Sequence, residues 1–135
     1  MTAPAGWARD LSSVRIAVIG DAIADVYITG RPLQVSREAP VLVIDFERES
    51  VSPGGAANTA ANLLAVGAPV ACAGIGGDVA NGTRLRAELA ARGADVEGLR
   101  ASPGRTVAKL RILAGDAHRT KQHLVKIHYP PTARM

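Results

Sequence analysis

The chain has 135 residues, of which 47% are hydrophobic and 21% charged, and this composition is typical of one globular domain or part of one. No apolar run is long enough to cross a bilayer, and residues 1–11 lack the apolar core of a signal peptide, so we expect a soluble, cytoplasmic protein with a flexible leader at residues 1–13. Aromatic residues make up only 3%, so small aliphatic residues must fill the core, which favours closely packed α/β layers over a small β-barrel. The net charge is +4.

The first part of the chain predicts three strands. Val14–Ile19 is a short apolar run that ends in Gly20-Asp21, a pattern typical of a buried parallel strand entering a functional turn. Asp25–Gly30 and Val41–Glu47 are rich in strand-forming residues and are expected to pair, with residues 31–39 as a long connection between them.

A helix and a strand are predicted next. Ser52–Gly55 has the composition of a turn. Ala56–Val66 is rich in alanine at helical spacing and is followed by Gly67, a helix stop. Pro69–Ile75 is expected to be another short buried strand.

The second helix is predicted over Gly82–Arg92, with Asn81 as its cap and Gly93 as its end. Strands that alternate with helices predict a parallel sheet with helices packed on it, and the expected strand pair interrupts this pattern. Two helices and about three core strands are too few for a complete doubly wound domain of roughly 100–200 residues, so we expect a partial domain.

The last part of the chain predicts a second hairpin. Thr106–Ile112 and Lys121–Tyr129 alternate apolar and polar residues, and Leu113–Asp116 supplies turn residues between them. Lys109 and Arg111 are expected on one solvated, basic face of this hairpin.

The charge of the chain is unevenly distributed. Residues 1–100 carry a net charge of −2 (9 Lys/Arg against 11 Asp/Glu), and residues 101–135 carry +6 (7 against 1). A basic segment of this kind suits an anionic partner such as a phosphorylated sugar, a nucleotide or a nucleic acid, and a solvated strand pair explains it equally well. Tyr129 is the only aromatic residue of this segment, so a base-stacking surface is absent and we expect no nucleic-acid partner.

The cysteine and the histidines of the basic segment predict no metal or disulfide chemistry. Cys72 is the only cysteine, so an internal disulfide is excluded, and its small apolar neighbours predict a buried thiol. His118, His123 and His128 recur every five residues, a spacing that alternates faces on a regular strand, so we predict no shared metal site.

The strongest chemical signal is Pro53-Gly54-Gly55-Ala56-Ala57-Asn58. The two glycines let the backbone approach a ligand closely, and the following helix directs its free N–H groups and positive dipole end at the turn. Asn58 has an amide that can donate to and accept from a hydroxyl group. A simple loop-to-helix turn is the alternative explanation of the same pattern.

Together with Leu63–Gly67 and Gly74–Asp78, these residues resemble the N-terminal signature of the PfkB/ribokinase family of carbohydrate kinases. Gly20-Asp21 with Asp25, Ser36–Val41 and the Lys109-x-Arg111 pair resemble the D-glycero-β-D-manno-heptose 7-phosphate kinase domain of bifunctional ADP-heptose synthesis proteins. The resemblance runs from about Val14 to Ile127. It implies an α/β, ribokinase-like fold, namely the N-terminal portion of a mostly parallel sheet with helices on both faces, plus a β-hairpin lid. The partial domain is then expected at residues 14–129, followed by a tail at residues 130–135.

The resemblance also implies roles for six residues. Asp25 matches the aspartate that binds sugar hydroxyls, which suits a carboxylate because it accepts two hydrogen bonds from neighbouring hydroxyls. Gly54, Gly55 and Asn58 match the turn that holds the sugar. Lys109 and Arg111 lie on the lid and are expected to face the substrate phosphate. No residue of this chain is assigned as catalytic.

The chain departs from the family in two respects. Where the heptose branch carries an Arg/Asp pattern, this chain has Lys126 and His128. The family's downstream Gly-Ala-Gly-Asp segment, which supplies the general base, and its Asn-x-x-Glu element, which organises Mg²⁺, have no match here. Ala114-Gly115-Asp116 falls in the predicted hairpin turn with no helix after it, so we do not expect Asp116 to be the base.

The resemblance implies two alternative functions. The first is the N-terminal, sugar-binding portion of an ATP- and Mg²⁺-dependent kinase acting on a phosphorylated sugar, most simply heptose 7-phosphate, with catalysis requiring the missing C-terminal kinase half or a partner chain. The second is a non-catalytic module that binds a sugar phosphate or forms a homodimer through its lid strands. The isolated 135-residue chain is expected to be inactive in either case.

Overall fold

The protein folds into two sheets and two helices in a computed structural model that describes residues 11–77, 80–102, 106–116 and 120–130. The described elements are, in chain order, β1 (Ile16–Ile19), β2 (Ala22–Val35), β3 (Leu42–Gly55), α1 (Ala56–Ala65), β4 (Val70–Gly77), α2 (Ala80–Ala91), β5 (Asp95–Ser102), β6 (Ala108–Ala114) and β7 (Gln122–Tyr129). The predicted leader and tail fall mostly outside the described ranges.

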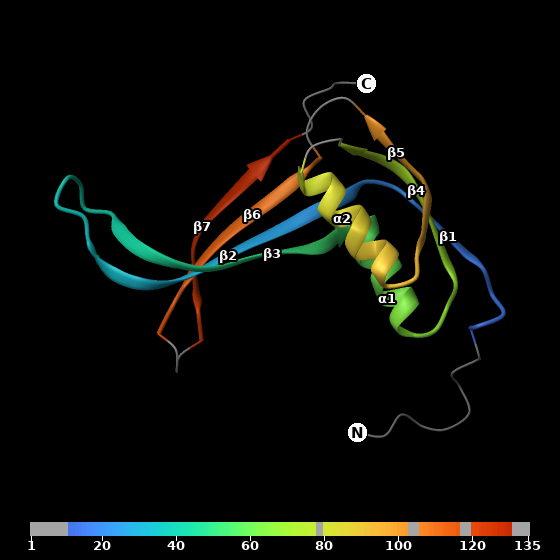
Figure 1. Ribbon diagram of the computed structural model, residues 1–135, viewed down its shortest axis with the longest axis horizontal. Helices are drawn as coiled ribbons and strands as arrows, with labels where there is room; N and C mark the ends of the chain where they lie inside the picture. Colours follow the sequence, from blue (N-terminus) through green and yellow to red (C-terminus); the bar gives the residue numbers. More distant parts are fainter. Residues whose placement is uncertain (1–10, 78–79, 103–105, 117–119, 131–135) are drawn as a thin grey trace, which may run out of the picture.

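The smaller sheet is parallel and has the strand order β1-β4-β5. Helix α1 connects β1 to β4 by way of the β2–β3 excursion, and α2 connects β4 to β5. The connections from β1 to β4 and from β4 to β5 each lead to the next strand in the same direction across the sheet. Because crossover connections between parallel strands are right-handed, both helices lie on the same face of the sheet. Figure 1 shows α1 and α2 on one side of these three strands. The parallel sheet with packed helices is thus as predicted, and the described part of the chain supplies the helices of one face.

The core of the molecule is built from small side chains. Leu89 is the largest fully buried side chain, and Leu85 and Leu99 are also buried. Most of the remaining core residues are alanines, which lie at the start of β2, along α1 and at the two ends of β6. Small side chains let helix and sheet backbones approach closely, which explains why so few aromatic residues are needed.

Cys72 lies in this core, as predicted. It is 4% exposed, and its thiol is free. Burial and, secondarily, the negative charge of Asp95 raise the pKa of the Cys72 thiol above its ordinary value. The thiol therefore stays protonated at neutral pH and serves as a packing group.

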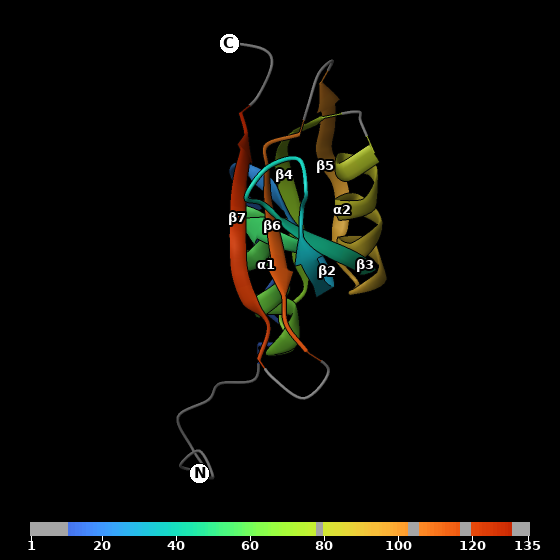
Figure 2. The ribbon, with the colours of Figure 1, turned by 90° about the vertical axis from the view of Figure 1, so that its left-hand side faces the viewer.

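The larger sheet has the order β3-β2-β6-β7 and joins the two predicted hairpins. β2 pairs antiparallel with β3 and parallel with β6, and β6 pairs antiparallel with β7. The outer parts of β2 and β3 continue as a two-stranded ribbon that extends away from the helices (Figure 1). Seen from the end of this ribbon, β6 and β7 lie to one side and α2 to the other (Figure 2).

Two predictions about this sheet were wrong. Residues 31–39 were expected to form a connection, but β2 continues to Val35. Ser52–Gly55 was expected to be a turn, but it forms the last residues of β3, with Gly55 opposite Ala22. Pairing with β2 satisfies the backbone of both segments, and Pro53 is tolerated because β3 is an edge strand, where a missing N–H leaves no ladder bond unmade.

The predicted boundaries of α2 and the strand count also need correction. Asn81 was predicted to cap α2, but the helix already includes Ala80, so Asn81 lies within its first turn. Strand β5 was not predicted, because its sequence contains Gly98 and no continuous apolar run. Both helices end as expected, since each stops two residues before a glycine with a φ of +90°, Gly67 or Gly93.

Neither of the two described helices is long and apolar enough to span a membrane.

Candidate functional site

Polar side chains form two rows across one face of the four-stranded sheet. Residues directly opposite each other in neighbouring strands project from the same face, so the strand register defines the rows. One row is Ser52, Asp25, Lys109 and His128, and the next is Ser50, Tyr27, Arg111 and Lys126, each in the order β3, β2, β6, β7. The alternate residues of β2, namely Ala24 and Val26, are buried, so the rows lie on the face directed away from the helices.

Asp25, Arg111 and Tyr27 form the centre of this surface. Arg111 Nη1 donates a hydrogen bond to Asp25 Oδ1 at 2.7 Å, and both side chains are 20% exposed. The Arg111 guanidinium carbon also lies 5.1 Å from the centroid of the Tyr27 ring, within cation–π range. The hydrogen bond to Asp25 raises the pKa of Arg111 above its ordinary value, so the guanidinium is charged at every physiological pH. Asp25 is thereby held in one position.

The character of the surface changes from one side of the sheet to the other. The β3 and β2 side offers the hydroxyls of Ser50 and Ser52 and the Asp25 carboxylate, which are groups that recognise hydroxylated ligands. The β6 and β7 side offers cations, which recognise phosphate or carboxylate groups. Since adjacent strands are about 4.8 Å apart, the two ends of this gradient are roughly 10–15 Å apart, a span suited to a small phosphorylated ligand.

Gly54 and Gly55 adjoin this surface at the end of β3. A Cβ atom placed on Gly54 would lie 2.7 Å from Asp25 Oδ2, so a side chain there would displace the carboxylate. Gly55 has a φ of +57° and precedes the first residue of α1, where it permits the sharp entry into the helix. Asn58 is exposed in the first turn of α1, and no described hydrogen bond joins it to Asp25 or Arg111.

Four of the six predicted binding residues are thus brought together, and two stand beside them. Asp25, Gly54, Lys109 and Arg111 share one face of the sheet, as expected for a single site. The sequence analysis placed Asp25 and Arg111 on separate parts of the ligand, whereas the structure pairs them with each other.

Other polar residues of the two rows were not predicted as site residues: Tyr27, Ser50, Ser52, Lys126 and His128. Only the register between strands reveals them, because their spacing along the chain is that of any alternating strand.

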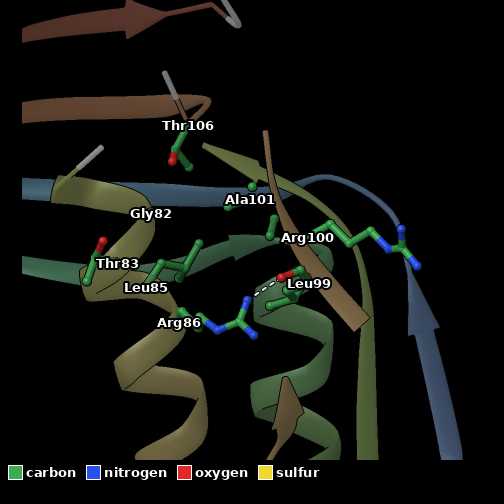
Figure 3. A pocket seen from close by; sticks show the side chains of 10 residues that line it. Gly82, Thr83, Leu85, Arg86, Leu99, Arg100, Ala101 and Thr106 are labelled. Carbon is green, nitrogen blue, oxygen red and sulfur yellow. Dashed lines mark hydrogen bonds between the residues drawn. The ribbon is translucent and has the colours of Figure 1, made fainter. Parts of the chain in front are cut away.

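A concavity separate from the polar rows lies at the carboxyl ends of β4 and β5, against the first turns of α2. It has a volume of about 180 Å³ and contains none of the six predicted binding residues. Figure 3 shows Arg86 donating a hydrogen bond to the Leu99 carbonyl oxygen, while Arg100 extends away from the other labelled side chains. Arg86 is thus held by the backbone of β5, and the lining of the pocket combines alanine and leucine side chains with Thr83, Thr106 and the two arginines.

The two described histidines do not lie as predicted. A β-bulge between Ile112 and Leu113 places His123 opposite Leu113, on the same face as His128 opposite Lys109, so the expected alternation of faces is wrong. The two positions are four residues apart along β6, about 13 Å. His118 lies outside the described residues, and within the described ranges no three His, Cys, Asp or Glu side chains gather as a metal site would require.

The sequence and the fold both match known proteins. The profile of pfkB family carbohydrate kinases matches residues 14–122. The chain is 41% identical over 121 residues to a "Bifunctional protein HldE" of Geobacter metallireducens, which covers 89% of this chain and 23% of that protein. It is 45% identical over 101 residues to a protein of the same name from Helicobacter pylori, covering 74% of this chain and 22% of the relative. The chain thus spans about a quarter of the length of these relatives.

Solved structures of sugar kinases share the fold. Arabidopsis thaliana ribokinase complexed with ribose and ATP superposes with a TM-score of 0.62 at 23% identity, over 85% of this chain and 35% of that one. Fructokinase from Xylella fastidiosa superposes with a TM-score of 0.54 at 27% identity, over 86% of this chain and 33% of the other. The ribokinase-like fold class predicted from the sequence is therefore confirmed.

Proposed function

Because the chain belongs to the pfkB family of carbohydrate kinases, we propose that it is the N-terminal, sugar-binding portion of a kinase that phosphorylates a hydroxyl of heptose 7-phosphate. The observation that carries this proposal is the joining of a carboxylate, Asp25, to a cationic pair of β6 residues, Lys109 and Arg111, on one face of the sheet. Such a surface matches a ligand that has hydroxyls at one end and a phosphate at the other.

In this function the chain binds and orients the sugar. Asp25 accepts hydrogen bonds from sugar hydroxyls, and the absence of a side chain at Gly54 keeps the carboxylate accessible. The Ala56 N–H is donated to the Asp21 carbonyl oxygen, so the next backbone N–H groups of α1 and the amide of Asn58 are the further donors proposed for the sugar. Lys109 and Arg111 attract the substrate phosphate. Holding the acceptor hydroxyl in place is a large part of phosphoryl-transfer catalysis, because that chemistry depends mainly on positioning and electrostatics.

ATP and Mg²⁺ would supply the transferred phosphoryl group and neutralise its charge. The described residues do not fit a magnesium site, since they contain no cluster of three metal-ligating side chains. We therefore propose that the nucleotide, the metal ion and the catalytic base are held by a C-terminal kinase half or by a partner chain, and that residues 14–129 are a partial domain.

An uncovered sheet face supports this requirement for a missing half. Opposite the helices, the three-stranded parallel sheet presents Ile19 and Ile75, which are 79% and 51% exposed, beside the small side chains of Ala17 and Ala73. Parallel sheets are normally covered on both faces, and open edge strands such as β1 favour further pairing. An apolar layer packed here would complete the domain.

Calorimetry of the purified chain tests the proposed function. We expect heptose 7-phosphate to bind with a measurable heat. We expect ATP with Mg²⁺ to produce none, because the two polar rows are proposed to bind the sugar and not the nucleotide. Sodium chloride at the same ionic strength serves as the control for non-specific ionic effects. Binding of ATP alone, or of none of these ligands by a folded chain, would contradict the assignment.

The alternative function, a dimerising module, is favoured by the opposite face of the four-stranded sheet. Phe46, Val125 and Ile127 lie on that face and are 64%, 47% and 38% exposed. We propose that a second copy of the chain packs on them, since the inner part of the same face is already buried by α2.

Sedimentation equilibrium tests this pairing. The wild-type chain is expected to dimerise at micromolar concentration, and Ile127→Glu is expected to be monomeric, because a carboxylate in an apolar interface loses its hydration. Val66→Glu is the matched control, since Val66 is 63% exposed beyond the end of α1. A monomeric wild type, or dimers in all three proteins, would exclude pairing through the lid.

A further inference from the structure

The basic side of the candidate site is wider than the two residues that the sequence singled out. On β6, Lys109 and Arg111 are two residues apart, and on β7 His128 and Lys126 stand directly opposite them. Directly opposed side chains in an antiparallel pair have Cβ atoms about 5 Å apart. Three cationic side chains and one histidine therefore share one small patch, which we call the cation grid.

No acidic residue offsets the cation grid within its own strands. β6 and β7 contain no aspartate or glutamate, and of the four grid residues Arg111 alone has a described ion pair, with Asp25. Like charges that face each other across a strand pair reduce the stability of the sheet. An arrangement that repels in this way is stabilised when an anion lies between the charges.

Lysines on edge strands also prevent unwanted strand pairing, and β7 is an edge strand. That role needs a charge at the edge, but it does not need the charge to stand opposite Arg111, nor a histidine opposite Lys109. The register, and not the composition alone, therefore points to a ligand.

We propose that Lys109, Lys126 and His128 bind the phosphate group of the ligand, and that the β7 residues determine selectivity for phosphorylated over unphosphorylated sugars. This inference rests on the proposed function and deepens it. Arg111 is held by Asp25 and the ring of Tyr27, so it marks the border between the sugar and the phosphate. The three other grid residues have exposed or half-buried side chains, are free of described ion pairs, and are available as donors.

The geometry orients the ligand. The Asp25 strand β2 is separated from β7 by one intervening strand, so the carboxylate and the β7 cations are roughly 10 Å apart. The sugar hydroxyls then lie over β2 and β3, and the phosphate lies over β6 and β7. A sugar without the phosphate makes only the first set of contacts.

The test compares Lys126→Gln, His128→Gln and the double variant with the wild-type chain. For heptose 7-phosphate, calorimetry is expected to give about tenfold weaker binding for each single variant and roughly a hundredfold for the double variant, because each loses one charge-assisted hydrogen bond. Binding of the unphosphorylated heptose is expected to be unchanged. Arg92→Gln, which removes a charge directly after α2, is the control.

A second measurement separates the failure of this inference from the failure of the proposed function. Inorganic phosphate, at constant ionic strength set with sodium chloride, is expected to raise the melting temperature of the wild type and of Arg92→Gln, and not that of the double variant. If phosphate has this selective effect while heptose 7-phosphate does not bind, the grid is an anion site and the assigned sugar is wrong. If the double variant responds to phosphate as the wild type does, or loses affinity equally for both forms of the sugar, the inference is overturned.

Discussion

Replacing Asp25 with asparagine is expected to weaken the binding of heptose 7-phosphate by about a hundredfold or more. The carboxylate has nearly the same shape as the amide but accepts hydrogen bonds with a full negative charge, and two such bonds to sugar hydroxyls contribute on the order of 3 kcal/mol together. The substitution also removes the partner of Arg111, whose side chain is only 20% exposed. Calorimetry on the purified variant measures the affinity.

Two controls identify the cause of this loss. Asp45→Asn also removes a carboxylate from this sheet, but that carboxylate pairs with Arg31 on the exposed ribbon. The variant is therefore expected to leave the affinity for heptose 7-phosphate unchanged. The double variant Asp25→Asn/Arg111→Gln restores charge balance without restoring the carboxylate, and we expect it to bind at least as weakly as Asp25→Asn. Full affinity in the double variant would mean that Asp25 acts only as a counter-ion and does not touch the sugar.

The second large effect concerns the core. Leu89→Ala is expected to lower the free energy of unfolding by about 3 kcal/mol, because Leu89 is completely buried on α2 and the surrounding alanines have no long side chains to fill the cavity. Domains of this size are stabilised by only about 5–15 kcal/mol, so this is a large fraction of the total. Urea denaturation followed by circular dichroism measures the change.

Leu33→Ala provides the comparison for the core variant. Leu33 is 61% exposed on the outer part of β2, so the same chemical change is expected to alter the free energy of unfolding by less than about 0.5 kcal/mol. Equal losses in the two variants would show that the ribbon is as tightly packed as the core, in conflict with the burial of these side chains.

Charge distribution links these expectations. Of the basic segment predicted from residues 101–135, the charged residues of β6 and β7, namely Lys109, Arg111 and Lys126, lie on one face of the sheet once β6 pairs with β2 and β7. Its cations on the face of Asp25 lie beside hydroxyl and carboxylate groups, whereas the apolar residues Val125 and Ile127 occupy the other face. One strand pair therefore serves two surfaces, a polar one proposed for the sugar phosphate and an apolar one proposed for a second copy.

The sequence by itself determined the elements whose signals are local. Val14–Ile19 and Pro69–Ile75 were predicted as buried strands, and the structure has the parallel strands β1 and β4 there. Their predicted burial was wrong on the face away from the helices, where Ile19 is 79% and Ile75 51% exposed, because no described element covers that face. Helix α1 was predicted from its alanine spacing and its glycine stop. The family signature in Pro53–Asn58 was also readable, since it depends on residue types at fixed offsets.

The tertiary structure alone decided which distant residues meet. Asp25 and Arg111 are 86 positions apart, and no local pattern indicates that β2 and β6 pair in parallel with these residues on one face. The same ladder extended β2 to Val35, converted the predicted turn at Ser52–Gly55 into strand, and placed His123 on the face of His128 through a bulge. Local strand and turn propensities are weak compared with a long ladder of backbone hydrogen bonds. A shift of the register by one residue exchanges the two faces of a strand, and only packing between the strands selects the register.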